Sequence, residues 1–120
     1  MKESEIQRLI LDYLEARRIL AFRMNSGVMK GTYGGKSRFV RFGVAGMADV
    51  LAFPMTVAFV QSGPQTGNYR QMPMPYWIEV KDEKGKQTDL QKSFQEQVES
   101  EGHRYILARS LEDVKQALGA

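Results

Sequence analysis

Near the start of the chain, apolar residues recur three and four positions apart, which is the spacing of one face of an α-helix. This stripe consists of Ile6, Leu9, Ile10, Tyr13 and Leu14. Ser4 and Gln7 stand three residues apart before it, in the pattern of a capping box that opens a helix. The pattern therefore predicts a first helix that runs to about Arg17 or Arg18.

Short apolar runs bounded by turn residues then predict β-structure. The run before Pro54 is nearly all apolar, which is typical of a central strand buried on both faces. Residues 27–42 are rich in glycine and end in alternating basic and apolar residues, so we expect a hairpin or a mobile loop leading to a strand. Residues 61–75 contain glycines and prolines without a periodic apolar pattern, which predicts a surface loop. The predicted strands are residues 19–24, 50–53, 57–60 and 76–81.

The last third of the chain predicts a helix, a strand and a second helix. Thr88 and Gln91 form another capping box, and the helix that follows ends near Gly102. Residues 105–108 predict a strand, and Ser110 opens the final helix. The predicted order is α-β-β-β-α-β-α, which indicates an α/β fold with a mixed sheet and helices packed on it. At 120 residues, we expect a single domain over residues 1–120.

Composition excludes several classes of protein. The hydrophobic content of 42% and charged content of 26% are ordinary for a globular domain, and no apolar run approaches the ~20 residues of a membrane span. Acids stand at the N-terminus where a secretory signal would be apolar. The chain has no cysteine, which fits a reducing cytoplasm, and one histidine, which argues against a histidine-rich zinc site. We therefore expect a cytoplasmic protein without a membrane partner.

The distribution of charge says more than its sum. The net charge of +3 is a weak indication of an anionic partner. Between residues 23 and 41, however, the chain carries five basic residues and no acid. Such a cluster suits contact with a nucleic-acid backbone, and a solvated hairpin surface explains it equally well. The cluster consists of Arg23, Lys30, Lys36, Arg38 and Arg41.

Three ionisable residues suggest a site for chemistry. Asp49 precedes a buried run, where a charge is expensive unless a metal ion, a lysine or a helix N-terminus compensates it. Glu79 and Lys81 stand two apart on a predicted strand, so their side chains share one face of the sheet. An acid and an amine on one face, with a second acid nearby, suit a divalent cation and a phosphate. Taken alone, Glu79 and Lys81 are also compatible with an exposed ion pair.

Two further residues have alternative interpretations. Gln91 is at the helical position where a glutamine satisfies the amide of the cap residue, and it is also placed to reach Lys81 or a phosphate. Glu5 is either a first-turn acid favoured by the helix dipole or an outer ligand of a metal.

Four elements follow one another along the chain: Glu5, Gly46-x-x-Asp49, Glu79-Val80-Lys81 and Gln91. In this order they resemble the motif of the PD-(D/E)xK nuclease superfamily. More narrowly, nearly the whole chain resembles the stand-alone VRR-NUC domains of phages and bacteria, although Ala48 replaces the proline that precedes the acid in the superfamily. The resemblance implies a restriction-endonuclease-like sheet and a Mg²⁺- or Mn²⁺-dependent endonuclease acting on DNA, often branched, flapped or four-way junction DNA.

The resemblance also implies roles for individual residues. Asp49, Glu79 and the backbone carbonyl of Val80 would bind the metal, Glu5 would assist through water, and Lys81 would orient or activate the attacking water. Oxygen ligands without Cys or His clusters favour a hard cation. Because one small chain offers one active site, symmetric cutting of two strands favours a homodimer. The alternatives are a catalytically inactive DNA-binding module of the same fold and an adaptor that binds a protein partner through residues 61–75.

Overall fold

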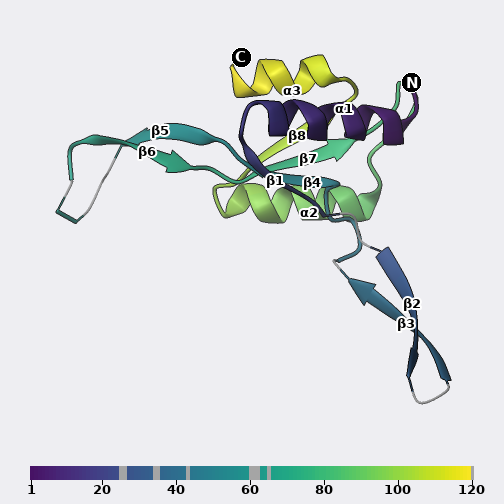
Figure 1. Ribbon diagram of the computed structural model, residues 1–120. Helices are drawn as coiled ribbons and strands as arrows, with labels where there is room; N and C mark the ends of the chain where they lie inside the picture. Colours follow the sequence, from purple (N-terminus) through teal and green to yellow (C-terminus); the bar gives the residue numbers. More distant parts are fainter. Residues whose placement is uncertain (25–26, 34–35, 43, 60–62, 65, 120) are drawn as a thin grey trace.

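The computed structural model has a mixed α/β fold, which confirms the predicted class (Figure 1). It describes residues 1–24, 27–33, 36–42, 44–59, 63–64 and 66–119, with 27–33, 36–42 and 58–59 described by their backbone alone. The helices are α1 (Glu3–Ala16), α2 (Asp89–Ser100) and α3 (Leu111–Leu118). The central sheet, in spatial order, consists of β1 (Leu20–Arg23), β4 (Val50–Phe53), β7 (Tyr76–Val80) and β8 (Arg104–Ala108).

The sheet is mixed because its last connection passes through a helix. β1, β4 and β7 pair antiparallel, whereas β7 and β8 pair parallel and are joined through α2. A parallel pair requires such a crossover connection. α1 and α3 cover one face of the sheet and α2 covers the other (Figure 1).

Two hairpins extend from this body and form separate two-stranded sheets (Figure 1). The first consists of β2 (Gly27–Tyr33) and β3 (Lys36–Phe42), so the expected hairpin at this place is confirmed. The second consists of β5 (Met55–Phe59) and β6 (Tyr69–Pro73). The prediction of a surface loop over residues 61–75 is therefore wrong for β6. This strand forms by pairing with β5 and has no buried apolar face, so the apolar pattern did not indicate it.

Because side chains alternate along a strand, neighbouring residues of the sheet lie on opposite faces, one covered by α1 and α3 and the other by α2. On the α1 and α3 side, the buried side chains of Val50, Ile78 and Val80 pack with apolar residues of both helices. On the α2 side, the ring of Trp77 lies 4.9 Å from that of Phe94 in an edge-to-face contact. Within the described residues, none of the helices is long and apolar enough to cross a membrane.

Candidate active site

Asp49 and Glu79 lie side by side where β4 begins and β7 ends. Val50 pairs with Ile78 in the antiparallel register of β4 and β7, which places Asp49 opposite Glu79 one position further on. The backbone N–H of Val80 donates to Oδ2 of Asp49 at 2.7 Å. The backbone N–H of Met24 donates to the carbonyl of Asp49 at 2.7 Å. Backbone donors from two other segments therefore hold Asp49 in place.

The carboxyl group of Glu79 is buried next to that of Asp49. Glu79 is 2% exposed, and no donor among the described residues reaches its Oε1. Burial, followed by the hydrogen bond and the negative charge of Asp49, raises the pKa of Glu79 to about 9 from its ordinary 4.5. The positive charge of Lys81 opposes this rise in pKa. The two carboxyl groups therefore lack a compensating positive charge, which either a proton or a bound cation would supply.

Lys81 is the residue two positions after Glu79, and its positive charge acts on the carboxyl group of Glu79. It follows directly on β7 and is only 9% exposed. A Cβ placed on Gly85 would lie 3.2 Å from Cδ of Lys81 and 3.2 Å from Oε1 of Glu3. The turn after β7 therefore packs against the lysine stem and against an acid of α1.

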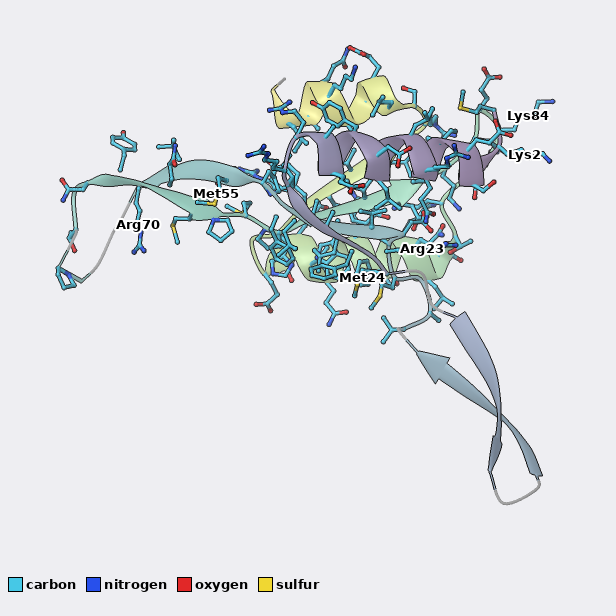
Figure 2. All side chains as sticks on the ribbon, in the orientation of Figure 1. Lys2, Arg23, Met24, Met55, Arg70 and Lys84 are labelled. Carbon is cyan, nitrogen blue, oxygen red and sulfur yellow. The ribbon has the colours of Figure 1, made fainter. Side chains whose placement is uncertain are left out.

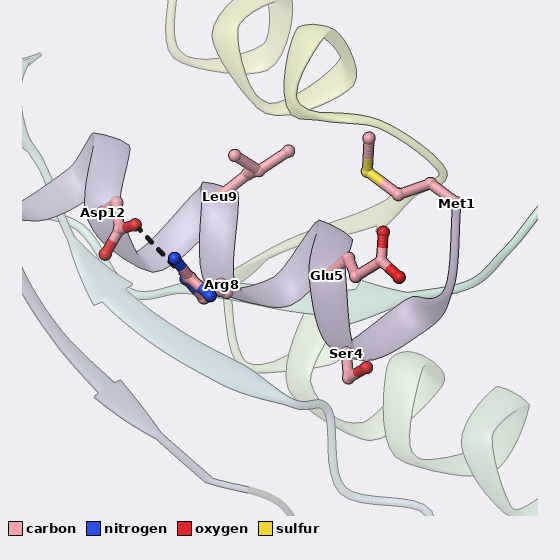
Figure 3. Close-up of a pocket in the computed structure, with 6 residues that line it drawn as sticks. All are labelled: Met1, Ser4, Glu5, Arg8, Leu9 and Asp12. Carbon is pink, nitrogen blue, oxygen red and sulfur yellow. Dashed lines mark ion pairs between the residues drawn. The ribbon is translucent and has the colours of Figure 1, made fainter.

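The acid that α1 brings to the site is Glu3. Its charge contributes to the raised pKa of Glu79. Glu5, the residue singled out from the sequence, lines a hollow on another face of α1 with Met1 and Leu9 (Figure 3). Glu3 also lines a hollow of about 520 Å³ that contains Asp49 and the buried side chain of Gln7. The structure thus brings Asp49, Glu79 and Lys81 together and leaves Glu5 outside the group.

The sequence contains a signal for Glu3 and Gln7 in addition to the residues predicted from it. Residues 3, 7, 10 and 14 recur at helical spacing, so both polar residues continue the face of the buried Ile10 and Leu14. A polar residue on such a face needs polar surroundings, and both residues find them in the hollow that Asp49 also lines.

Gln91 acts as a helix cap. Its Oε1 accepts a hydrogen bond from the N–H of Thr88 at 2.9 Å, and its own N–H donates to Oγ1 of Thr88 at 3.1 Å. The first turn of α2 also contacts Gly46, which has a φ of +84° and whose Cβ position would collide with the carbonyl oxygen of Leu90. This contact holds the segment that leads to Asp49. The catalytic role of Gln91 stays a prediction.

The basic cluster divides between the site and the first hairpin. Arg23 lies at the end of β1, is exposed, and lines the same hollow as Asp49 (Figure 2). The other four residues are on β2 and β3, and their side chains lie outside the described part of the structure. They are Lys30, Lys36, Arg38 and Arg41.

The donor set fits a hard divalent cation. The structure offers the carboxyl oxygens of Asp49 and Glu79, and the resemblance adds the backbone carbonyl of Val80 as a third oxygen ligand. Among the residues that the structure describes, no three acidic or histidine side chains group closely enough to enclose a metal. Mg²⁺ usually binds through one or two carboxylates and keeps several waters, so a complete protein cage is not required.

Comparison with protein-family models, with curated proteins and with solved structures finds no match to this chain.

Proposed function

We propose that this protein is a metal-dependent DNA endonuclease of the VRR-NUC type within the PD-(D/E)xK superfamily. The observation that carries the proposal is the buried Oε1 of Glu79, which no donor among the described residues reaches, in a carboxyl group hydrogen-bonded to Asp49. A buried carboxyl group held next to a second, partly exposed one is an unfavourable arrangement unless positive charge is added. A hard divalent cation, Mg²⁺ or Mn²⁺, supplies that charge and accepts the available oxygen ligands.

Each residue of the site has a role in this proposal. Asp49, Glu79 and the carbonyl of Val80 hold the cation, and Glu3 takes the supporting role that the sequence suggested for Glu5. Once bound, the cation acts as a Lewis acid toward the phosphate. The amine of Lys81 stabilises the negative charge that grows on the phosphate while water attacks phosphorus and the P–O bond to the sugar breaks.

The proposed substrate is branched, flapped or four-way junction DNA, with duplex DNA as the simplest alternative. Arg23 at the hollow and the basic residues of β2 and β3 contact backbone phosphates. A homodimer supplies the second active site that symmetric cutting requires. The proposal places this activity in the cytoplasm of a bacterium or of a phage-infected cell.

Replacement of Lys81 tests the proposal. We expect Lys81→Ala to retain DNA binding and to lose cleavage by about two decades in rate, because removal of one such aimed group costs roughly 3 kcal/mol. Lys84→Ala is the matched control, since Lys84 is an exposed lysine of the same turn. Cleavage is measured in Mn²⁺ and in chelator on single-stranded, duplex, flap and four-way substrates. Equal loss of binding and cutting would argue that Lys81 is only structural.

The second candidate is a catalytically inactive DNA-binding module of the same fold. The raised pKa of Glu79 favours it, because a proton shared with Asp49 also satisfies the pair. Titration calorimetry with Mn²⁺ distinguishes the two candidates. A nuclease binds the ion in a manner that Asp49→Asn abolishes, whereas the inactive module binds DNA without binding the ion at this pair.

A further inference from the structure

The backbone turn that follows Lys81 is closed by its own first residue. Oδ1 of Asp82 accepts hydrogen bonds from the N–H of Lys84 at 3.0 Å and from the N–H of Gly85 at 2.6 Å. An aspartate that bonds the backbone two and three residues ahead is a common way to build such a turn. These bonds satisfy the N–H groups of the turn and leave its carbonyl groups to find other donors.

Arg109, the residue that follows β8, supplies those donors. Its Nη1 donates to the carbonyl of Asp82 at 2.6 Å and to the carbonyl of Gly85 at 2.8 Å, so one nitrogen joins both ends of the turn. Hydrogen bonds from a charged donor are stronger than neutral ones. A planar guanidinium is also less free to reorient than a lysine amine.

Arg109 is itself held by structure on both sides. Its backbone N–H donates to Oδ2 of Asp113 in the first turn of α3, at 2.8 Å. The preceding residue, Ala108, accepts the N–H of Lys81 at 2.9 Å through its carbonyl. The side chain of Arg109 thus links the end of β8 to the turn, next to the point where β8 already bonds Lys81.

The turn determines where the lysine stem lies. Gly85 packs so closely that an added Cβ would lie 3.2 Å from Cδ of Lys81, from Oε1 of Glu3 and from Oδ1 of Asp82. The turn therefore restricts where the side chains of Lys81 and of Glu3 can lie. Movement of Gly85 would release both side chains.

We propose that Arg109 is a positioning residue: by fixing the turn 82–85, it holds the stem of Lys81, whose charge acts on Glu79, in place. Without this donor, two carbonyl groups lose their charged partner and the turn relaxes away from the lysine stem. The catalytic consequence rests on the proposed function, because an amine displaced by about 1 Å loses on the order of a hundredfold in rate. The effect on the lysine itself does not depend on any activity.

Acylation of lysines measures this effect directly. The whole protein is treated with N-hydroxysuccinimidyl acetate, and peptide mass spectrometry gives the rate at each lysine. In the wild-type protein we expect the buried Lys81 to react more slowly than the exposed Lys84. Arg109→Gln should raise the rate at Lys81 several-fold and leave Lys84 unchanged. Arg104→Gln is the matched control, because it removes an exposed cation from β8 and should change neither rate.

An unchanged rate at Lys81 in folded Arg109→Gln would overturn the proposal. If that variant fails to fold, Arg109→Lys and Gly85→Ala decide the question. A lysine at 109 keeps the charge but loses the planar donor geometry, so the rate at Lys81 should rise above that of the wild-type protein. Gly85→Ala presses on the lysine stem from the other side of the turn and should also change the rate at Lys81. The unchanged rate in both variants would equally overturn the proposal.

Cleavage assays separate this proposal from the proposed function. If the protein is a nuclease, Arg109→Gln should lower kcat at least tenfold, with KM and DNA affinity in Ca²⁺ unchanged, and Arg109→Lys should restore part of the loss. A fall in DNA affinity instead would assign Arg109 to DNA contact and contradict a positioning role. If the wild-type protein cleaves no DNA, the proposed function fails, and the acylation rates still decide whether Arg109 holds Lys81.

Discussion

At the scale of single residues, Asp49 and Glu79 form a carboxyl pair for which a proton and a cation would compete under the proposed function. The metal-free protein satisfies Glu79 by protonation, because burial and the neighbouring carboxyl group raise its pKa to about 9. A bound divalent cation would displace that proton and lower the same pKa. A rise in pH should therefore lower the stability of the metal-free protein, whereas added metal should raise the stability.

This competition predicts a pH dependence of stability in chelator. Between the unfolded pKa of 4.5 and the folded pKa of about 9, the folded state binds a proton that the unfolded chain releases. The free energy of unfolding should therefore decrease as the pH rises through this window. Urea unfolding measured at intervals between these two pH values should show the decrease in the wild-type protein and a smaller one in Glu79→Gln.

Two comparisons make this measurement specific. Glu83→Gln removes an exposed acid from the turn after β7 and should keep the wild-type dependence. Added Mn²⁺ should stabilise the wild-type protein most at high pH, where the proton competes least. A decrease of the same size in Glu79→Gln would mean that other groups cause it.

The sequence revealed some of these residues more readily than others. Glu79 and Lys81 were predicted to stand together because strand alternation is local and needs no knowledge of the fold. Glu3, unlike Glu5, continues the helical face of the buried Ile10 and Leu14, so the spacing favours it, but only the packed structure shows what lies opposite that face. Gln91 is at a position where capping and ligand contact require the same residue, so its spacing alone does not distinguish them.

At the scale of elements, the start of α2 supports the segment that carries Asp49. Gly46 combines a positive φ of +84° with close contact to the first turn of α2, so it requires glycine for two reasons. Gly102, at the other end of α2, has a φ of +86° with nothing within 4 Å of its Cβ position. The two glycines thus differ in steric contact while sharing their backbone conformation.

Alanine substitution at these two glycines should separate the two effects. Gly102→Ala should cost about 1–2 kcal/mol of unfolding free energy for its left-handed backbone. Gly46→Ala should cost a further 1–3 kcal/mol, roughly the penalty for overpacking, because the new methyl group displaces α2 or the Asp49 segment. Urea unfolding gives both values. Equal costs would show that the contact between Gly46 and α2 relaxes without strain.

Elements of the core were more predictable than elements outside it. The strands 50–53 and 76–80 have buried apolar side chains, and those side chains make the pattern that predicts them. β6 carries an all-exposed pattern and ends at Pro73, so nothing in its composition indicates a strand. β6 forms because its backbone pairs with β5, and the pattern of hydrophobic residues in a sequence does not reveal such pairing.

At the scale of the whole molecule, the two hairpins extend the protein well beyond its core. The radius of gyration is 17.1 Å. A compact domain of this length has about 13.6 Å. The hairpins differ in charge: β2 and β3 carry four basic residues and no acid, whereas Arg70 is the single charged residue of β5 and β6. The chain between β1 and Asp49 forms the basic hairpin, so this hairpin leaves the body beside the proposed site (Figure 1).

This difference predicts how salt should affect DNA binding. Each cation that neutralises a phosphate contributes about 0.9 to the slope of log affinity against log salt, so replacing all four with Gln should reduce the slope by up to about 3.6. Fluorescence anisotropy with duplex DNA in Ca²⁺ gives the slope without cleavage. The substituted residues are Lys30, Lys36, Arg38 and Arg41.

The opposite hairpin provides the control for this prediction. Arg70→Gln removes the cation of β6 and should leave the slope close to that of the wild-type protein. If the quadruple variant also keeps the wild-type slope, the basic hairpin is a solvated surface, and the phosphate contacts must come from Arg23 and the hollow beside Asp49. A reduced slope would instead place DNA along a strand pair of roughly 24 Å, since seven residues advance about 3.4 Å each. That length covers several phosphates and begins beside the carboxyl pair, which is the placement that the proposed cleavage of a held duplex requires.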